Sequence, residues 1–192
     1  MNNPPRLSVG SHEKGSGKGC AMNVVSWENG DRKITDFPEC ADRFLARVVQ
    51  RFNDNYCIHR QNDLICASCS VIILKFAHRT VGTSLLTSHS PRARVEIYAK
   101  IARTEVFYAV DAVDAAYFAF AFAAASAASA AAADTFAFAA TDTFAAVADA
   151  QFLIEQIERI FTQFEAFSGI KAQETPASKT EEAVAKMLKV SI

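Results

Sequence analysis

An alanine-rich tract in the C-terminal half constrains the fold of this chain more than any other feature. Of the 35 alanines in the 192 residues, 22 lie between Ala109 and Ala150. Alanine has the highest helix propensity of the natural residues and is depleted in strands. The tract is therefore expected to be helical, and its small side chains favour close pairing with other helices.

The phenylalanines of the tract supply most of its large apolar surface. Phe118 and Phe120 recur 18 residues later, and 18 residues make five helical turns, so each pair returns to the same helix face. Because Phe118 and Phe120 point about 200° apart on a helix, more than one face needs cover. We expect a second copy of the chain to provide it, which predicts a homo-oligomer. The expected interface consists of Phe118, Phe120, Phe122, Phe136, Phe138 and Phe144.

A membrane span is the alternative for segment 115–133, whose 19 uncharged residues reach the length that a spanning helix needs. Composition argues against it, because 13 of the 19 are alanine, which inserts weakly. No lysine or arginine lies between Arg103 and Arg159 to set an orientation. The polar N-terminus also lacks an apolar leader, so we expect a cytoplasmic protein with reduced cysteines.

Charge is distributed unevenly along the chain. Residues 1–103 carry a balance of +6, from 15 basic and 9 acidic residues, whereas residues 104–168 carry −8, from one basic and nine acidic residues. This asymmetry predicts two modules or two faces that meet. Arg43, Arg47 and Arg51 form a basic stripe on a predicted helix, which we interpret as its solvated flank or as a partner for the acidic alanine-rich half. With a net charge of −1 and no nucleic-acid-binding motif, no nucleic-acid partner is expected.

The predicted fold class is mainly α, in four parts. Residues 1–19 are an extended arm rich in glycine, serine and proline, and residues 20–84 are a small, mainly helical module that contains cysteine and histidine. Residues 91–168 are expected to form long alanine-rich helices that pair as a bundle or a coiled coil. Residues 169–192 are a linker and a short terminal helix.

Capping patterns predict where the first helices begin. Asp36-Phe37-Pro38-Glu39 combines an N-cap acid, an early proline and a glutamate three residues on, which predicts a helix start near Asp36. An apolar stripe follows and ends at residues 53–55. A second helix is expected from Asn62 or Asp63 to Phe76, and its apolar surface predicts burial. The stripe of the first helix comprises Phe44, Leu45, Val48, Val49 and Phe52.

Two more helices have clear boundary residues, and one segment stays ambiguous. Ser90-Pro91 predicts a helix start, and Gly169 predicts the end of a last long helix over 143–167. Segment 20–27 is either a short helix or one arm of a hairpin closed at Asn29-Gly30.

The N-terminal cysteines are the first candidates for chemistry. His12, Cys20, Asp36 and Cys40 offer imidazole, thiolate and carboxylate ligands, which suit zinc. The plainer interpretation is that Cys20 and Cys40 are small buried apolar residues. A third is that Cys20 is the nucleophile of a cysteine-dependent hydrolase at the start of a helix.

A second group of cysteines follows the first helix. Cys66-Ala-Ser-Cys69 is expected in the middle of a helix, where both thiols would be core residues. A redox role for such a pair would need a preceding strand and a helix N-terminus to lower the thiol pKa. The alternative is a metal set in which Cys57 and His59 join Cys66 and Cys69.

The N-terminal half carries a block of short motifs: Gly10-Ser-His12, Cys20-Ala-Met, Asp36-Phe-Pro38-Glu-Cys40, Asn53-Asp54 and Gly82-Thr83. In these motifs it resembles a group of uncharacterised proteins from bacteria and their phages. These proteins often end in alanine-rich repeats. The resemblance implies that His12, Cys20, Asp36 and Cys40 form one local cluster, and it implies no reaction. The chain departs from the group at Asn23, where many members have glutamate, and in its additional Cys57, Cys66 and Cys69.

The leading hypothesis is therefore a non-catalytic structural or interaction protein that self-associates through its Ala/Phe-rich helices. A zinc-stabilised binding module and a cysteine-dependent hydrolase are the alternatives.

Overall fold

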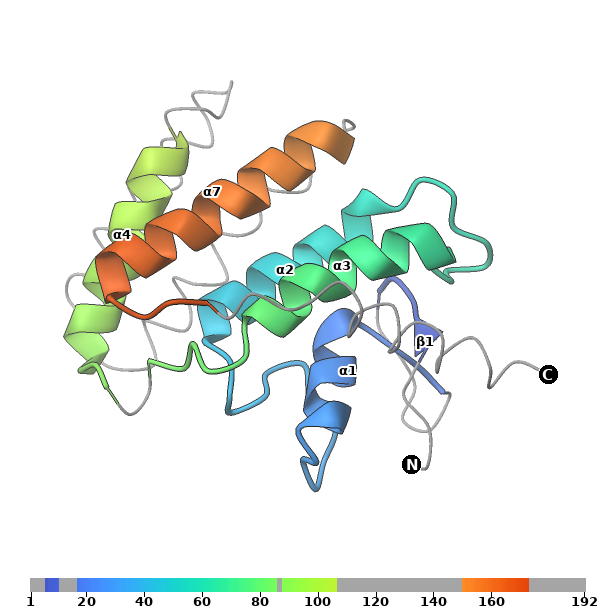
Figure 1. Cartoon of the computed structure of the whole chain (residues 1–192), viewed down its shortest axis with the longest axis horizontal. Helices are drawn as coiled ribbons and strands as arrows, with labels where there is room; N and C mark the ends of the chain where they lie inside the picture. Colours follow the sequence, from blue (N-terminus) through green and yellow to red (C-terminus); the bar gives the residue numbers. More distant parts are fainter. Residues whose placement is uncertain (1–5, 11–16, 86–87, 107–149, 173–192) are drawn as a thin grey trace.

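A computed structural model describes residues 6–10, 17–85, 88–106 and 150–172 of this chain. This part is mainly helical, as predicted, and its one sheet is a pair of two-residue strands. The alanine-rich tract with its six phenylalanines, His12 and the expected terminal helix lie outside the described residues. The elements, shown in Figure 1, are β1 (Arg6–Leu7), β2 (Lys18–Gly19), α1 (Ala21–Glu28), α2 (Arg43–Tyr56), α3 (Ala67–Arg79), α4 (Pro91–Val106) and α7 (Ala150–Ser168).

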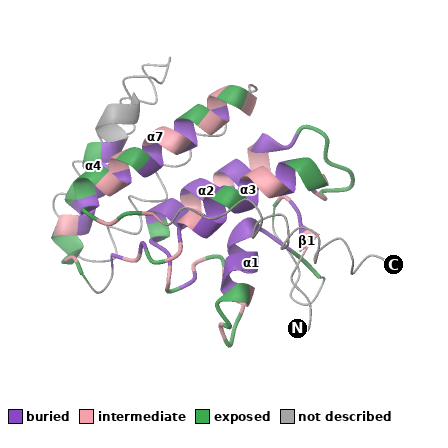
Figure 2. Cartoon of the chain, in the orientation of Figure 1, coloured by how far each residue is buried: buried purple, intermediate pink, exposed green. Residues whose placement is uncertain are grey.

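Helix α2 lies at the centre of the core and packs against α1, α3 and α7, while α4 packs against α7. The predicted apolar stripe of α2 is fully buried, as the purple side of the ribbon shows in Figure 2. The Phe52 ring stacks on Tyr56 at 4.6 Å between centroids and meets Phe76 of α3 edge-on at 5.2 Å. Phe76 in turn contacts Phe161 of α7 at 6.1 Å, so aromatic contacts join three helices.

Helix α2 begins at Arg43, and its N-cap lies six residues later than Asp36, the N-cap that the capping pattern predicts. The actual N-cap is Asp42, whose carboxylate accepts hydrogen bonds from the backbone N–H groups of Phe44 and Leu45. Residues 36–41 are instead a connecting loop that closes with a turn from the Ala41 N–H to the Pro38 carbonyl. The basic stripe lies on α2, where Arg47 is half-buried and donates to Gln50.

Segment 20–27 is helical, and the hairpin alternative is wrong. In α1 the Asn23 side chain turns back to accept a hydrogen bond from the Cys20 N–H at 3.0 Å. The helix ends at Glu28 with Asn29 as its C-cap, and Gly30 takes a positive φ of 75° that a glycine adopts without strain. The Asn-Gly pair thus ends a helix here.

The residues expected to end α2 instead lie inside it and anchor the N-terminal arm. Asn53 is completely buried; its side chain accepts from the Ala21 N–H and donates to the Ser8 carbonyl. Asp54 accepts from the Gly10 N–H at 3.1 Å. The described part of the arm is therefore held against α2, and β1 pairs in parallel with β2 beside α1.

Helix α3 begins at Ala67, several residues after the predicted start at Asn62 or Asp63. Asn62 and Asp63 have φ angles of 47° and 65°, a left-handed conformation that no α-helix contains. They form a tight turn in which Gln61 and Leu64 exchange backbone hydrogen bonds. This shift moves Cys66 from the expected helix interior to the N-cap of α3.

The remaining boundaries follow the prediction more closely. Helix α4 starts at Pro91, and the Ser90 hydroxyl accepts from the Ala93 N–H. Helix α7 ends at Ser168, followed by Gly169 with a φ of 72°. No helix within the described ranges is long and apolar enough to cross a membrane.

Candidate metal centre

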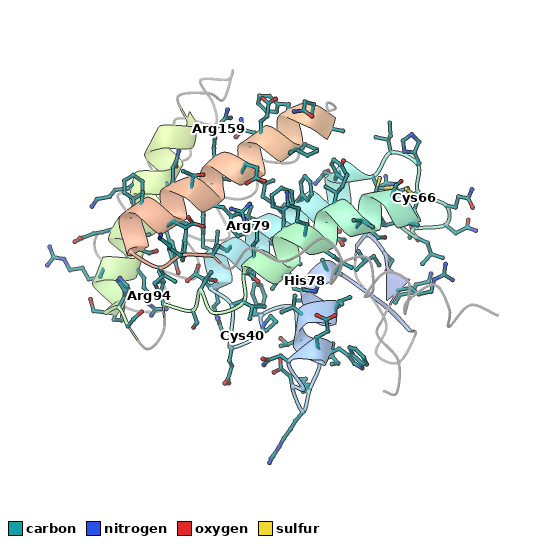
Figure 3. All side chains as sticks on the ribbon, viewed as in Figure 1. Cys40, Cys66, His78, Arg79, Arg94 and Arg159 are labelled. Atoms are coloured by element: carbon teal, nitrogen blue, oxygen red, sulfur yellow. The ribbon has the colours of Figure 1, made fainter. Side chains whose placement is uncertain are left out.

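Three cysteines meet where the loop between α2 and α3 joins the two helices. Cys57 is the C-cap of α2, Cys66 is the N-cap of α3, and Cys69 lies in the first turn of α3. Their sulfur atoms all lie within 4.8 Å of one another, and those of Cys57 and Cys66 are 3.7 Å apart. Figure 3 shows sulfur atoms gathered beside the Cys66 label at this end of the helix pair.

Backbone hydrogen bonds from the N-terminal arm hold this loop in place. The Ile65 N–H donates to the Leu7 carbonyl at 3.0 Å, and the Val9 N–H donates to the Asp63 carbonyl at 2.9 Å. The residue before Cys66 is therefore tied to β1, and the turn before it is closed on itself. The position of the three thiols thus depends on contacts between segments that are far apart in the sequence.

The three thiols differ in exposure. Cys57 and Cys69 are buried, with 2 % and 9 % of their surface exposed, whereas Cys66 is only half-buried. The loop residues Ile58 and His59 are exposed, and Ile58 keeps 72 % of its surface open to solvent. A ligand can therefore reach the cluster from the side of Cys66 and the loop.

The thiols also differ in acidity. Burial acts to raise the pKa of Cys66, but hydrogen bonds from the Ser68 hydroxyl, the Cys69 backbone and the two other thiols stabilise its thiolate and lower the pKa to about 6. Burial and the neighbouring Cys57 and Cys66 raise the pKa of Cys69 to about 12. Burial, followed by the three nearby cysteines, also raises the pKa of Tyr56. The Cys66 thiolate is therefore available near neutral pH, whereas the Cys69 thiol stays protonated until a cation compensates its charge.

This geometry suits a thiophilic metal ion. Two thiolates bound to one tetrahedral zinc at about 2.3 Å each lie about 3.8 Å apart. The Cys57–Cys66 separation of 3.7 Å already matches that spacing, and Cys69 needs little movement to join. The three cysteines could hold a metal ion.

Of the four predicted metal ligands, the structure brings two together. The Cys20 sulfur lies 3.6 Å from Asp36 Oδ1, which also accepts from the Asn23 side chain at 2.7 Å. Within the described residues, the donor atoms of Cys20, Asp36 and Cys40 do not gather at metal-ligand distances. Cys40 lies in the turn before α2, where its carbonyl accepts from the Gly82 N–H. Position 12, the fourth predicted ligand, lies outside the described residues.

Cys20 has the environment of a core residue. It is 6 % exposed, and burial together with the Asp36 charge raises its pKa to about 12. A cysteine nucleophile needs a lowered pKa and an accessible sulfur. The geometry therefore gives no support to a hydrolase that uses Cys20.

The prediction that Cys66 and Cys69 lie in the middle of a helix is wrong. With α3 starting at Ala67, Cys66-x-x-Cys69 stands at a helix N-terminus, where the first backbone N–H groups favour a thiolate. The signal that could have shown this is Asn62-Asp63, a pair typical of tight turns.

Comparisons with family models, with curated proteins and with solved structures find no match for this chain.

Proposed function

We propose that this chain is a metal-binding protein that holds zinc, or an ion with the same preference for thiolates, at Cys57, Cys66 and Cys69. The observation that carries the proposal is the convergence of three sulfurs within 4.8 Å at the junction of two helices. Thiolate ligands select zinc and other soft ions over magnesium and calcium, which prefer oxygen.

The site would act as a structural cross-link. A bound ion would join the end of α2 to the start of α3 and fix the loop between Cys57 and Cys66. Structural zinc sites contribute directly to folding free energy, because the unfolded chain holds no preformed site. The proposed role is therefore that of a metal-stabilised module, which uses the cysteines of the alternative metal set instead of His12, Cys20, Asp36 and Cys40.

Titration of the metal-free full-length chain with Co²⁺ tests this proposal. We expect a sulfur-to-cobalt charge-transfer band that saturates at one equivalent and disappears when zinc displaces the cobalt. The variants Cys57→Ser, Cys66→Ser and Cys69→Ser should each weaken binding by roughly tenfold or more, equal to at least about 1.4 kcal/mol.

Cys20→Ser and Cys40→Ser are the matched controls, because they remove thiols from outside the cluster. They should leave the cobalt spectrum unchanged. A chain without a charge-transfer band, or one whose band depends on Cys20 and Cys40, would contradict the proposal.

A further inference from the structure

We propose that the same cluster is also a thiol–disulfide exchange site, in which Cys57 and Cys66 close into a reversible disulfide when the chain meets a low-molecular-weight disulfide. The inference concerns the metal-free chain. Only its consequence for metal binding rests on the function proposed above.

The two sulfurs are already close enough for this reaction. They lie 3.7 Å apart, and a disulfide bond is about 2.0 Å long, so each sulfur has to move by only about 1 Å. Both residues have extended backbone conformations at the ends of their helices, with φ and ψ of −88° and 106° at Cys57 and −66° and 160° at Cys66. Rotation of the two side chains can therefore close the bond without breaking a helix.

Exposure decides which sulfur reacts first. Cys66 is half-buried and stands at the solvent-exposed side of the cluster, whereas Cys57 and Cys69 are buried. An oxidant thus meets Cys66 before the other two. Cys57 then lies next to the newly formed mixed disulfide, opposite the first turn of α3.

The thiol–disulfide exchange takes place in two steps. The Cys66 thiolate attacks one sulfur of a disulfide R–S–S–R, forms Cys66–S–S–R and releases one thiolate, which takes up a proton as R–SH. The Cys57 sulfur then attacks Cys66 Sγ, gives up its proton and expels the second thiolate as R–SH. The two cysteines lose two electrons in total, and the oxidant gains them.

This product differs from the disulfide that a redox Cys-x-x-Cys motif would form. Cys66-x-x-Cys69 would pair within α3, but Cys69 is buried inside the first helical turn. The Cys57–Cys66 bond instead joins α2 to α3. It also removes two of the three metal-binding thiolates, so the oxidised chain should lose its affinity for the metal.

Peptide mapping of the full-length chain tests the inference. The metal-free protein is incubated with oxidised glutathione, alkylated, and digested with trypsin without reduction. Cleavage after Arg51, Arg60 and Lys75 places Cys57 in the peptide 52–60 and both Cys66 and Cys69 in the peptide 61–75. We expect these two peptides to be joined, with the cross-link at Cys66 by fragmentation, and dithiothreitol to separate them.

Two variants distinguish the reaction steps. Cys57→Ser should trap one glutathione on Cys66, because the second step is lost, whereas Cys69→Ser should still form the cross-link. Three results for the wild type would overturn the inference. They are a Cys66–Cys69 disulfide within peptide 61–75, a glutathione adduct on Cys66 that persists, and thiols that stay unmodified. Cobalt binding without cross-linking contradicts this inference alone, and cross-linking without cobalt binding contradicts the proposed metal function alone.

Discussion

The Tyr98 hydroxyl of α4 donates a 2.7 Å hydrogen bond to the carboxylate of Asp42, the residue that caps α2. Asp42 is 3 % exposed, and its burial raises the pKa of the carboxyl to about 6. The hydrogen bonds from Tyr98, Leu45 and Phe44 and the charge of Arg94 oppose this shift without cancelling it. The contact thus couples the position of α4 to the start of the central helix through a carboxylate that is costly to ionise.

The stability of the chain should therefore depend on the protonation of Asp42. A folded-state pKa of about 6, above the ordinary 3.8, means that the folded chain holds the proton more tightly than the unfolded chain. The Asp42 contribution to the free energy of unfolding should rise by about 1 kcal/mol as the pH falls from 7 to 5, and it is lost as the pH rises through 6.

Asp42→Asn provides the comparison, because asparagine also caps helices and carries no charge. Urea unfolding of both proteins at pH 5 and pH 7 measures the difference. At pH 5 the free energy of unfolding of the wild type should be higher, relative to that of Asp42→Asn, than it is at pH 7. Equal pH dependence in both proteins would show that this carboxyl does not titrate in the range.

Arg79 of α3 contacts Phe161 and Glu158 of α7. Its guanidinium lies 4.4 Å from the centre of the Phe161 ring and pairs with Glu158, and the Arg79 side chain is only 14 % exposed. Arg79→Ala should lower the free energy of unfolding by about 1–2 kcal/mol, through a lost cation–π contact and a partly screened ion pair.

Arg92→Ala is the matched control for that prediction. Arg92 pairs with Glu96 one turn along α4 and is 90 % exposed, so its loss should cost at most a few tenths of a kcal/mol. Thermal unfolding of both variants makes the comparison. Equal effects would mean that Arg79 does not dock α7.

The sequence also suggests His59 as a metal ligand; the structure leaves it exposed in the loop, two residues after Cys57, and outside the group of three converging sulfurs. A tetrahedral ion bound by three cysteines has one open position. We predict that the His59 ring occupies it, so His59→Ala should weaken Co²⁺ binding by about tenfold, equal to about 1.4 kcal/mol. The d–d absorption of the bound cobalt reports the change; identical spectra and affinities would assign the fourth position to water.

Self-association through the alanine-rich tract stays a prediction, since the tract lies outside the described residues. Each phenylalanine is worth roughly 1.5–3 kcal/mol when fully buried. Phe120→Ser combined with Phe138→Ser should therefore dissociate the assembly, as measured by light scattering, and leave the unfolding transition of the described core in place. A wild-type chain that is monomeric at high micromolar concentration would refute the prediction.

Apolar periodicity predicted the helices well. The predicted starts of α2 and α3 were too early, whereas Ser90-Pro91 correctly marked the start of α4. The stripe from Phe44 to Phe52 is buried as expected, because a continuous apolar face requires cover wherever its helix begins. The predicted start of α2 was wrong because both Asp36 and Asp42 can cap a helix. Only burial against Tyr98, which comes from another helix, selects Asp42.

The convergence of the three cysteines could not be predicted from local patterns either, because it depends on contacts between distant segments. Cys66 reaches Cys57 because Asn62 and Asp63 turn the chain and because Ile65 is tied to Leu7. The first signal is local but weak, and the second joins residues 58 positions apart. The sequence suggested Cys57, His59, Cys66 and Cys69 as one alternative metal set, and the fold brings together the three sulfurs of that set without His59.

X-ray absorption at the zinc edge tests the central claim most directly, because it measures the atoms bound to the metal. For the full-length chain loaded with one equivalent of zinc, we predict three sulfur neighbours at about 2.3 Å and one lighter neighbour. A first shell of nitrogen and oxygen alone would contradict the account.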